Sequence, residues 1–195
     1  MHLIQIERQG FLPVTVEDLK KHSVIDHTDD DALLEDLLHT AVEQVEVDTG
    51  RTLVDTTRDA VLQCFPKVIR LPRPPVAEVL SIQYVDADGV EQALQADDYR
   101  VSLTVSGAEV RPVPGGSWPG VQANNAGAVR ARYRAGYMLV GEGETVVGEL
   151  PRRARQAVLI WAAHLYENRE HMSPVQLYEL PSYRSLLATL ETGLV

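Results

Sequence analysis

The sequence predicts an α+β protein with a helical core, made of long N-terminal and C-terminal helices, and an inserted antiparallel β region. Apolar residues recur at helical spacing within residues 29–49 and 151–170. Between them, short alternating runs broken by proline and glycine indicate strands and turns. We expect one domain over residues 1–195, divided into N-terminal helices (12–51), a β insertion (52–148), a long helix (149–171) and a C-terminal connector with a short helix (172–195).

The N-terminal helices are predicted from their ends. Thr15 is placed to cap the first, with Asp18 three residues later as in a capping box. Thr28 is expected to cap the second, and the acidic residues 29–31 suit the positive end of its dipole. Gly50 is expected to end this helix in a left-handed conformation. The stripe to be buried comprises Leu33, Leu34, Leu37, Leu38, Ala41, Val42 and Val45.

The middle of the chain reads as strands and turns. Asp86 to Gly89 is a turn sequence that should fold VLSIQYV into a hairpin with the residues after it. LPRPPV lacks too many amide donors to be a central strand and is expected to be an edge or connector. GGSWPG should be a loop. Further strands are expected at YRVSL, AEVRPV and AVRARYRAGY.

The C-terminal helices complete the predicted core. Pro151 suits the first position of a helix whose apolar face should pack on the stripe of residues 33–45. That face comprises Ala154, Ala157, Val158, Trp161, Ala162 and Leu165. Residues 172–181 are expected to connect it to a last short helix with Tyr183, Leu186, Leu187 and Leu190 apolar.

Composition excludes several classes of protein. A chain of 195 residues with 45% hydrophobic residues can bury one good core. Its one cysteine, Cys64, allows no disulfide framework, and no apolar run suits a membrane span or a signal peptide. The formal net charge is −10, and residues 1–50 hold twelve acidic and three basic residues. Such a surface repels phosphates and disfavours nucleic-acid binding.

No pattern indicates catalysis, so we expect no enzyme, no cofactor and no metal. The six histidines lack ligand spacing, and the consecutive acids 29–31 point in different directions on a helix. Asp86 and Asp88 resemble the start of a calcium loop, but the distal glutamate is missing. GGSWPG has no phosphate-loop lysine, and no serine lies in GxSxG.

Two segments are candidate interaction surfaces. Arg130, Arg132 and Arg134 alternate along one strand and share a face. That face is either solvated or a contact with an acidic partner, such as the acidic helical segment of a neighbouring copy. The C-terminal stretch, with Tyr178 and Leu180 before the last helix, either folds back on its own core or docks in a groove of a partner.

Several short strings, taken in order, resemble the head–tail connector (adaptor) proteins of tailed bacteriophages. They are VTVEDLKKH, Val24-Ile25-Asp26 before DDDALLEDLL, Thr49-Gly50-Arg51, LPRPPV, Tyr84 with Asp86 and Gly89, Tyr99, Trp118-Pro119, Tyr133 to Tyr137, and Pro151 with HLYENRE. The resemblance spans roughly residues 12–190, and residues 1–10 and 139–148 lie outside it.

The resemblance implies a virion structural protein of the neck, made in the host bacterial cytoplasm. Its copies form a ring, commonly twelvefold, that docks on the portal protein and receives stopper or tail-completion proteins, while double-stranded DNA passes through without specific binding. We assign neighbour contacts to Arg130, Arg132 and Arg134. Portal docking is assigned to Tyr178, Leu180, Tyr183, Leu186, Leu187 and Leu190. The alternatives are another neck protein, whether stopper or tail-completion, and a small soluble enzyme or ligand-binding domain.

Overall fold

The computed structural model describes residues 1–141, 146–168 and 181–191. Its helices are α1 (Val16–Ser23), α2 (Asp31–Thr49), the short 3₁₀ helix η1 (Ala96–Asp98), α3 (Arg152–Glu167) and α4 (Pro181–Glu191). Its strands are β1 (His2–Arg8), β2 (Thr56–Leu62), β3 (Ile69–Leu71), β4 (Val76–Val85), β5 (Glu91–Ala93), β6 (Tyr99–Thr104), β7 (Gly107–Pro112), β8 (Val129–Ala135), β9 (Leu139–Val140) and β10 (Val146–Val147).

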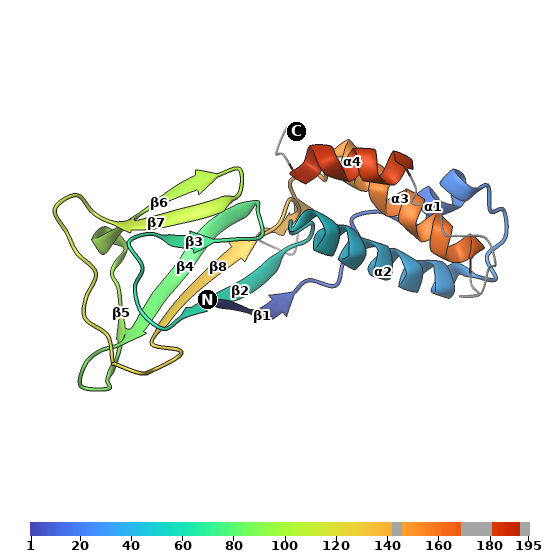
Figure 1. Cartoon of the computed structure of the whole chain (residues 1–195). Helices are drawn as coiled ribbons and strands as arrows, with labels where there is room; N and C mark the ends of the chain where they lie inside the picture. Colours follow the sequence, from blue (N-terminus) through green and yellow to red (C-terminus); the bar gives the residue numbers. More distant parts are fainter. Residues whose placement is uncertain (142–145, 169–180, 192–195) are drawn as a thin grey trace.

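The helices α1 to α4 pack side by side at one end of an elongated molecule (Figure 1). Thr15 and Asp18 form the predicted capping box at the start of α1. The predicted cap at Thr28 is wrong, because α2 starts later, with Asp30 as its N-cap. Gly50 ends α2 with φ of 64°, as predicted. The buried cluster includes Leu19, Leu34, Leu38, Ala41, Val42, Val45, Ala154, Ala157, Val158, Ala162, Tyr183, Leu187 and Leu190.

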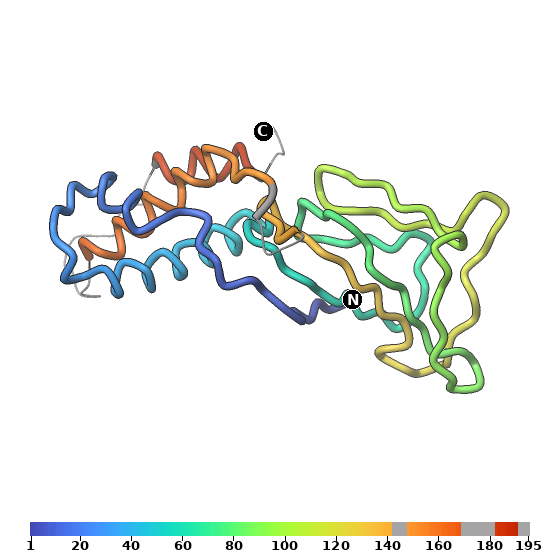
Figure 2. The backbone as a smooth tube through the Cα atoms, turned by 180° about the vertical axis from the view of Figure 1, so that it is seen from behind, coloured from blue at the N-terminus to red at the C-terminus, as the bar shows by residue number. Residues whose placement is uncertain are grey.

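The strands form a sandwich at the other end (Figures 1 and 2). One sheet has five strands in the order β1-β2-β8-β4-β5, the other has three in the order β3-β7-β6, and all their pairings are antiparallel. Strands β9 and β10 form a separate two-stranded antiparallel sheet. The sandwich has its own buried cluster, which includes Ala60, Ile69, Leu71, Ile82, Val110, Val129, Ala131 and Tyr133.

The predicted helical core with an inserted β region is therefore wrong. The strands are central, with a core of their own. The first of them, β1, precedes α1 and α2 and pairs with β2, which follows these two helices. The sheet thus includes the first residues of the chain, for which no role was predicted. Residues 2–8 form a strand because the backbone of β1 pairs along one side with β2, with Leu3 opposite Ala60, and this pairing adds β1 to the five-stranded sheet.

Two of the predicted connections are present. Asp86 accepts hydrogen bonds from Asp88 N at 3.0 Å and Val90 N at 2.9 Å, and the turn joins β4 to β5. The segment between β3 and β4 carries the prolines of LPRPPV, with a cis bond between Pro74 and Pro75. Among the described residues, no helix is both long enough and apolar enough to span a bilayer.

The end of β8 meets the start of β2 closely. Gly136 has φ of 145°, and a Cβ at this position would lie 2.8 Å from the carbonyl carbon and oxygen of Val54. Only glycine fits such an approach without displacing backbone. The chain can therefore turn from the sheet toward Tyr137, whose amide donates to Leu53 O at 3.2 Å.

Candidate functional site

The three predicted arginines project from one face of β8, in the centre of the five-stranded sheet. The alternation predicted from the sequence is present, since every second residue of the strand is buried on the opposite face. Those buried residues are Val129, Ala131, Tyr133 and Ala135. Tyr133 donates to Pro72 O at 2.9 Å, and burial raises its pKa to about 12.

Asp59 on β2 supplies a carboxylate to two of the arginines. Arg132 donates to it from Nε at 2.8 Å and from Nη2 at 3.0 Å, and the Nε of Arg130 lies 3.7 Å away. The hydrogen bonds to Asp59 raise the pKa of Arg132. Two-pronged charged pairs of this kind hold their partners in one geometry.

Asp55 performs the same role for Arg134. Arg134 Nε donates to Asp55 Oδ1 at 2.8 Å, and its Nη2 contacts both Asp55 Oδ2 and Val140 O. Burial alone would raise the pKa of Asp55, but the hydrogen bonds from Arg134 and from Val140 N outweigh it, so this pKa lies below its ordinary value. Glu78 adds a second carboxylate 3.5 Å from Arg134.

The arginine face is thus largely neutralised by carboxylates of its own chain. The assignment of Arg130, Arg132 and Arg134 to a neighbouring copy stays a prediction. Arg130 has the longest of these ion pairs and a side chain that is 46% exposed, so it is the member most open to a partner.

The C-terminal docking residues divide into two groups. Tyr178 and Leu180 lie outside the described residues. Tyr183, Leu187 and Leu190 are buried on the inner face of α4, and Leu186 is partly buried against the same cluster. Tyr183 stacks on Trp161 with ring centroids 5.0 Å apart and donates to Asp48 Oδ2 at 2.7 Å. Burial, together with this hydrogen bond, raises the pKa of Tyr183.

Arg51 fixes the end of α4. Its Nε donates to Leu190 O at 2.6 Å and its Nη1 donates to Tyr137 Oη at 2.8 Å. The guanidinium therefore caps the last turn of α4 and connects it to the segment that follows β8. In this arrangement α4 is part of the core of its own chain, and portal docking through its apolar residues stays a prediction.

A buried carboxylate lies where the helices meet the sandwich. Glu46 on α2 is 4% exposed, and its Oε1 accepts from Leu53 N at 2.6 Å and Val54 N at 3.4 Å. Its Oε2 accepts from Arg8 Nη1 at 2.8 Å. Sequence reasoning did not identify Glu46, although its place four residues after Val42 on the apolar stripe was an available signal.

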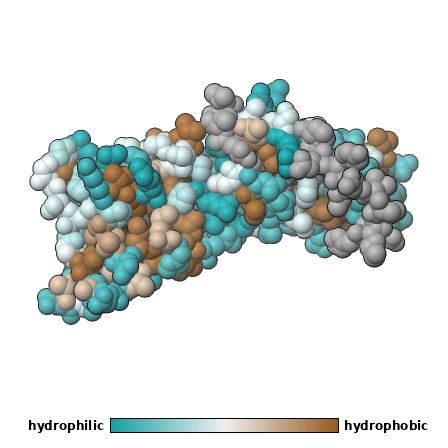
Figure 3. All heavy atoms as spheres, viewed as in Figure 1, coloured by the Kyte–Doolittle hydropathy of each residue, from teal (hydrophilic) through white to brown (hydrophobic). Residues whose placement is uncertain are grey.

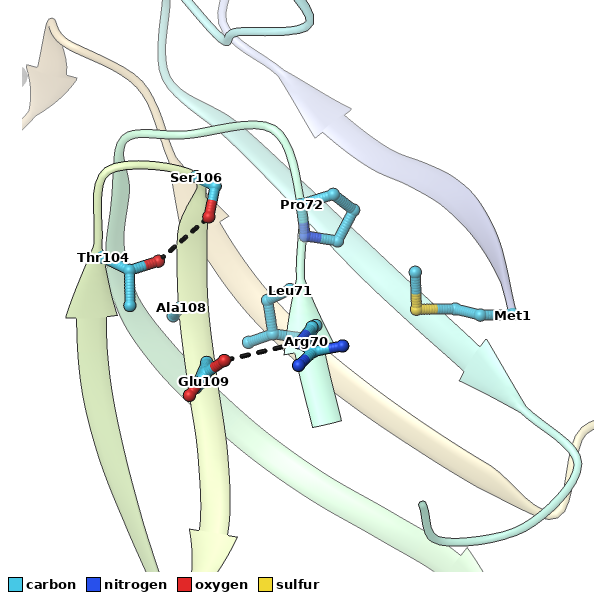
Figure 4. Close-up of a pocket in the computed structure, with 8 residues that line it drawn as sticks. All are labelled: Met1, Arg70, Leu71, Pro72, Thr104, Ser106, Ala108 and Glu109. Carbon is cyan, nitrogen blue, oxygen red and sulfur yellow. Dashed lines mark hydrogen bonds and ion pairs between the residues drawn. The ribbon is translucent and has the colours of Figure 1, made fainter. Parts of the chain in front are cut away.

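A small pocket lies beside the β6–β7 hairpin (Figure 4). It has a volume of about 250 Å³ and is lined by Met1, Arg70, Leu71, Pro72, Thr104, Ser106, Ala108 and Glu109. Its polar contacts are the ion pair of Arg70 with Glu109 at 3.3 Å and the hydrogen bond between Thr104 and Ser106 at 3.4 Å. Such contacts between neighbouring strands and within a turn are typical of the surface of a β-sheet.

Metal-ligating side chains do not converge in the part of the chain that the structure describes, where no group of three or more His, Cys, Asp or Glu residues is found. Cys64 is exposed. Exposed aliphatic residues lie on both ends of the molecule, and apolar surface is visible between polar loops of the sandwich (Figure 3). On the strands and turns of the sandwich they are Ile4, Ile6, Leu80, Val90, Val101, Leu103 and Val105, and on or beside the helices they are Val24, Leu33 and Val47.

Comparisons relate the chain to one group of proteins. Residues 13–83 match the family described as Phage gp6-like head-tail connector protein, which confirms the predicted resemblance over these residues. No curated protein matches the chain.

Solved structures extend the likeness over nearly the whole chain. A chain from the neck of an empty gene transfer agent (GTA) particle, computed with C6 symmetry, has a TM-score of 0.76 and 22% identity, covering 97% of this chain and 95% of that one. A chain from the virion of a native GTA particle gives the same values. One from the neck of a native GTA particle, computed with C12 symmetry, has a TM-score of 0.73 and 23% identity, covering 97% and 94%. This likeness shows a shared fold.

Proposed function

We infer that this chain is a structural protein of a phage or phage-like neck. The premise is that residues 13–83 match the phage gp6-like head–tail connector family. The family match is the single observation that carries the proposal. The fold shared with chains of neck structures over 97% of this chain supports it, because the likeness extends well beyond the matched residues.

The proposed assembly is a ring of identical copies, twelve in number. The neck structures that contain the similar chains were computed with C6 and C12 symmetry, which supports a closed ring. Cyclic assemblies join two different surfaces of neighbouring subunits. The elongated shape of the chain offers such surfaces on opposite sides (Figures 1 and 2).

In the proposed neck, one side of the ring docks on the portal protein and the other receives a stopper or tail-completion protein. The separation of a helical end from a sandwich end supports two-sided docking, because each end has its own core and its own surface. Double-stranded DNA would pass through the ring. The net charge of −10 supports passage without specific binding, since acidic surfaces repel phosphates.

Three of the proposed docking residues could contact a portal only after a structural change. Tyr183, Leu187 and Leu190 are buried where α4 packs against the helical core, so α4 would have to leave that position before they reached a portal. Leu186 is partly exposed and reaches a partner more easily. Tyr178 and Leu180 remain proposed portal contacts.

The test is the native mass of the purified protein alone and after mixing with the portal ring of the same phage or particle. We expect a complex containing about twelve copies on the portal, because neck rings are closed cyclic assemblies. A portal of unrelated sequence serves as the control. A protein that remains monomeric in both samples contradicts the proposed function.

A further inference from the structure

The three-stranded sheet of the sandwich has a free edge along β6. This strand pairs on one side with β7, in a register that runs from Tyr99 opposite Pro112 to Thr104 opposite Gly107 without a shift. On its other side no strand of the described residues pairs with it, and it is the outermost strand of its sheet (Figure 1). The backbone groups on that side are therefore available to a further strand.

Of the four outer strands in the two sheets of the sandwich, β6 is the one best suited to pairing. Strands β3 and β5 have three residues each. Strand β1 is longer, but its pairing with β2 is interrupted by a register shift between Gln5 and Glu7. Short strands and bulges discourage pairing with other chains. Strand β6 has neither feature, because it has six residues in a regular register and contains no proline.

The inner side of β6 is left uncovered by the sandwich. Val101 lies opposite the buried Val110 of β7, and Leu103 lies opposite the buried Ala108, so both side chains belong to the core side of the sheet. Val101 is nevertheless 40% exposed and Leu103 is 63% exposed. An added strand with apolar side chains on this side would bury both residues, and burial of apolar area stabilises the pairing.

The outer side of the same sheet carries arginines. Arg100 on β6 lies directly opposite Arg111 on β7, and like charges in such positions destabilise a sheet. Glu109 pairs with Arg111 at 2.7 Å and with Arg70 at 3.3 Å, the second pair being drawn in Figure 4. Arg100 is exposed and forms no ion pair with a described residue. This side therefore has an excess of positive charge in a chain whose net charge is −10.

We propose that β6 receives an extended segment of another neck protein, in which acidic residues alternate with apolar ones. The segment joins the sheet as a fourth strand. Side chains alternate between the two faces of a strand, so its apolar residues lie beside Val101 and Leu103 while its carboxylates lie beside Arg100. This proposal rests on the proposed function for the source of the segment.

Charge and shape select this occupant over the alternatives. The exposed acidic residues of α2 in a second copy are helical and cannot add as a strand. Strand β1 of a second copy has one acidic residue, Glu7, and Arg8 follows it, so it matches the arginines poorly. Phosphates of DNA would pair with Arg100 but would leave Val101 and Leu103 uncovered. An acidic and apolar peptide accounts for both sides of β6.

The first test titrates the purified chain with a synthetic probe, the peptide acetyl-Glu-Val-Glu-Val-Glu-Val-amide, by isothermal titration calorimetry. We expect binding at a single site that weakens as salt is raised from about 0.05 M to about 0.5 M, because salt screens exposed charges. One control peptide has lysine in place of glutamate. A second has the same composition, with its glutamates and valines in separate blocks. We expect neither control to bind.

Variants test the two sides of β6 separately. Arg100→Glu should weaken peptide binding by roughly tenfold or more, because an attraction is replaced by a repulsion. Arg153→Glu is its matched control at an exposed position of α3 and should bind as wild type does. Leu103→Thr should weaken binding about threefold to tenfold, because less apolar area is buried. Leu80→Thr, at a position of β4 that is 47% exposed, is the control for this change.

Hydrogen exchange tests the strand pairing itself. Saturating peptide should slow the exchange of the β6 amides that point away from β7 by about tenfold or more, because these amides gain hydrogen-bond partners. The amides of β1, at the edge of the other sheet, should exchange as before. A peptide that binds without slowing exchange in β6 is held by charge alone, and this result would overturn the proposal.

The remaining outcomes distinguish this proposal from the proposed function. A chain that forms its ring on the portal but does not bind the peptide overturns the proposal and leaves the proposed function standing. A chain that binds the peptide but never assembles does the reverse. Binding of double-stranded DNA that Arg100→Glu abolishes assigns the arginines to phosphate and overturns the proposal. Slow exchange in β6 of the concentrated chain alone assigns the edge to a second copy and overturns the stated partner.

Discussion

At the scale of single residues, Glu46 joins parts of the chain that are far apart in sequence. It accepts from the amides of Leu53 and Val54, which lead into β2, and from Arg8 at the end of β1. A buried carboxylate with several donors is well compensated, whereas its neutral amide analogue leaves the arginine unpaired. The charge of Glu46 should therefore matter to stability.

Glu46→Gln tests this. We expect it to lower the free energy of unfolding by about 2–4 kcal/mol, because Arg8 loses its carboxylate in a buried setting. Glu43→Gln is the control on the same helix, where the side chain is exposed, and it should stay within about 0.5 kcal/mol of wild type. Urea denaturation followed by circular dichroism measures both. Equal effects of the two variants would contradict the role of Glu46.

Sequence reasoning could find the arginines of β8 but not their partners. The alternation of Arg130, Arg132 and Arg134 is a local pattern, whereas Asp59 lies 73 residues from Arg132 in sequence and faces it only through strand pairing. Glu46 was missed for the same reason, since its donors are set by tertiary structure.

At the scale of elements, α4 is an amphipathic helix whose apolar side is covered by its own chain. Tyr183, Leu187 and Leu190 are buried, while Arg184 and Ala188 are exposed. Arg51 holds the last turn through Leu190 O. A change on the inner side should therefore affect folding, and the same change on the outer side should not.

Leu187→Asp and Ala188→Asp make that comparison at adjacent positions. We expect Leu187→Asp to destabilise the chain by about 3 kcal/mol or more, because it buries an unpaired charge, and to increase hydrogen exchange in α4. Ala188→Asp should leave exchange and Tm unchanged. An unaltered Tm for Leu187→Asp would mean that α4 is not held in the core in solution.

Elements with strong local signals were predictable, and those that depend on distant pairing were not. The stripe of α2, its Gly50 end and the turn from Asp86 to Gly89 are readable from neighbouring residues. Strand β1 was not, because its strand character depends on pairing with β2, which follows two helices. The predicted stripe was also imperfect, since Leu33 is 36% exposed.

At the scale of the whole molecule, two cores lie end to end, and the strands are not an appendage of the helices. The predicted fold class was wrong because residues 2–8 were not expected to form a strand. Without β1, the sheet seemed to lie entirely between helical segments of the chain. That the whole chain forms one domain stays a prediction. Most of the net charge of −10 belongs to one part of the chain, since residues 1–50, which include β1, α1 and α2, hold twelve acidic and three basic residues.

That charge predicts weak contact with DNA. We expect wild type to bind double-stranded DNA more weakly than roughly 100 µM at about 150 mM salt, because acidic surface repels phosphate. The double variant Glu35→Lys with Asp36→Lys, which changes the formal charge from −10 to −6, should bind measurably more tightly at low salt. Fluorescence anisotropy of a labelled duplex measures both. Tight, steeply salt-dependent binding by wild type would contradict free passage of DNA.

The pairing of β2 also constrains how the chain folds while it is being made. Strand β2 lies between β1 and β8, and its Asp59 pairs with a residue that leaves the ribosome 73 residues later. Local helices such as α2 can form early, whereas the five-stranded sheet must wait for β8. During this interval β1 and β2 have at most each other to pair with, so the nascent chain is most exposed to wrong strand pairing in the middle of its own synthesis.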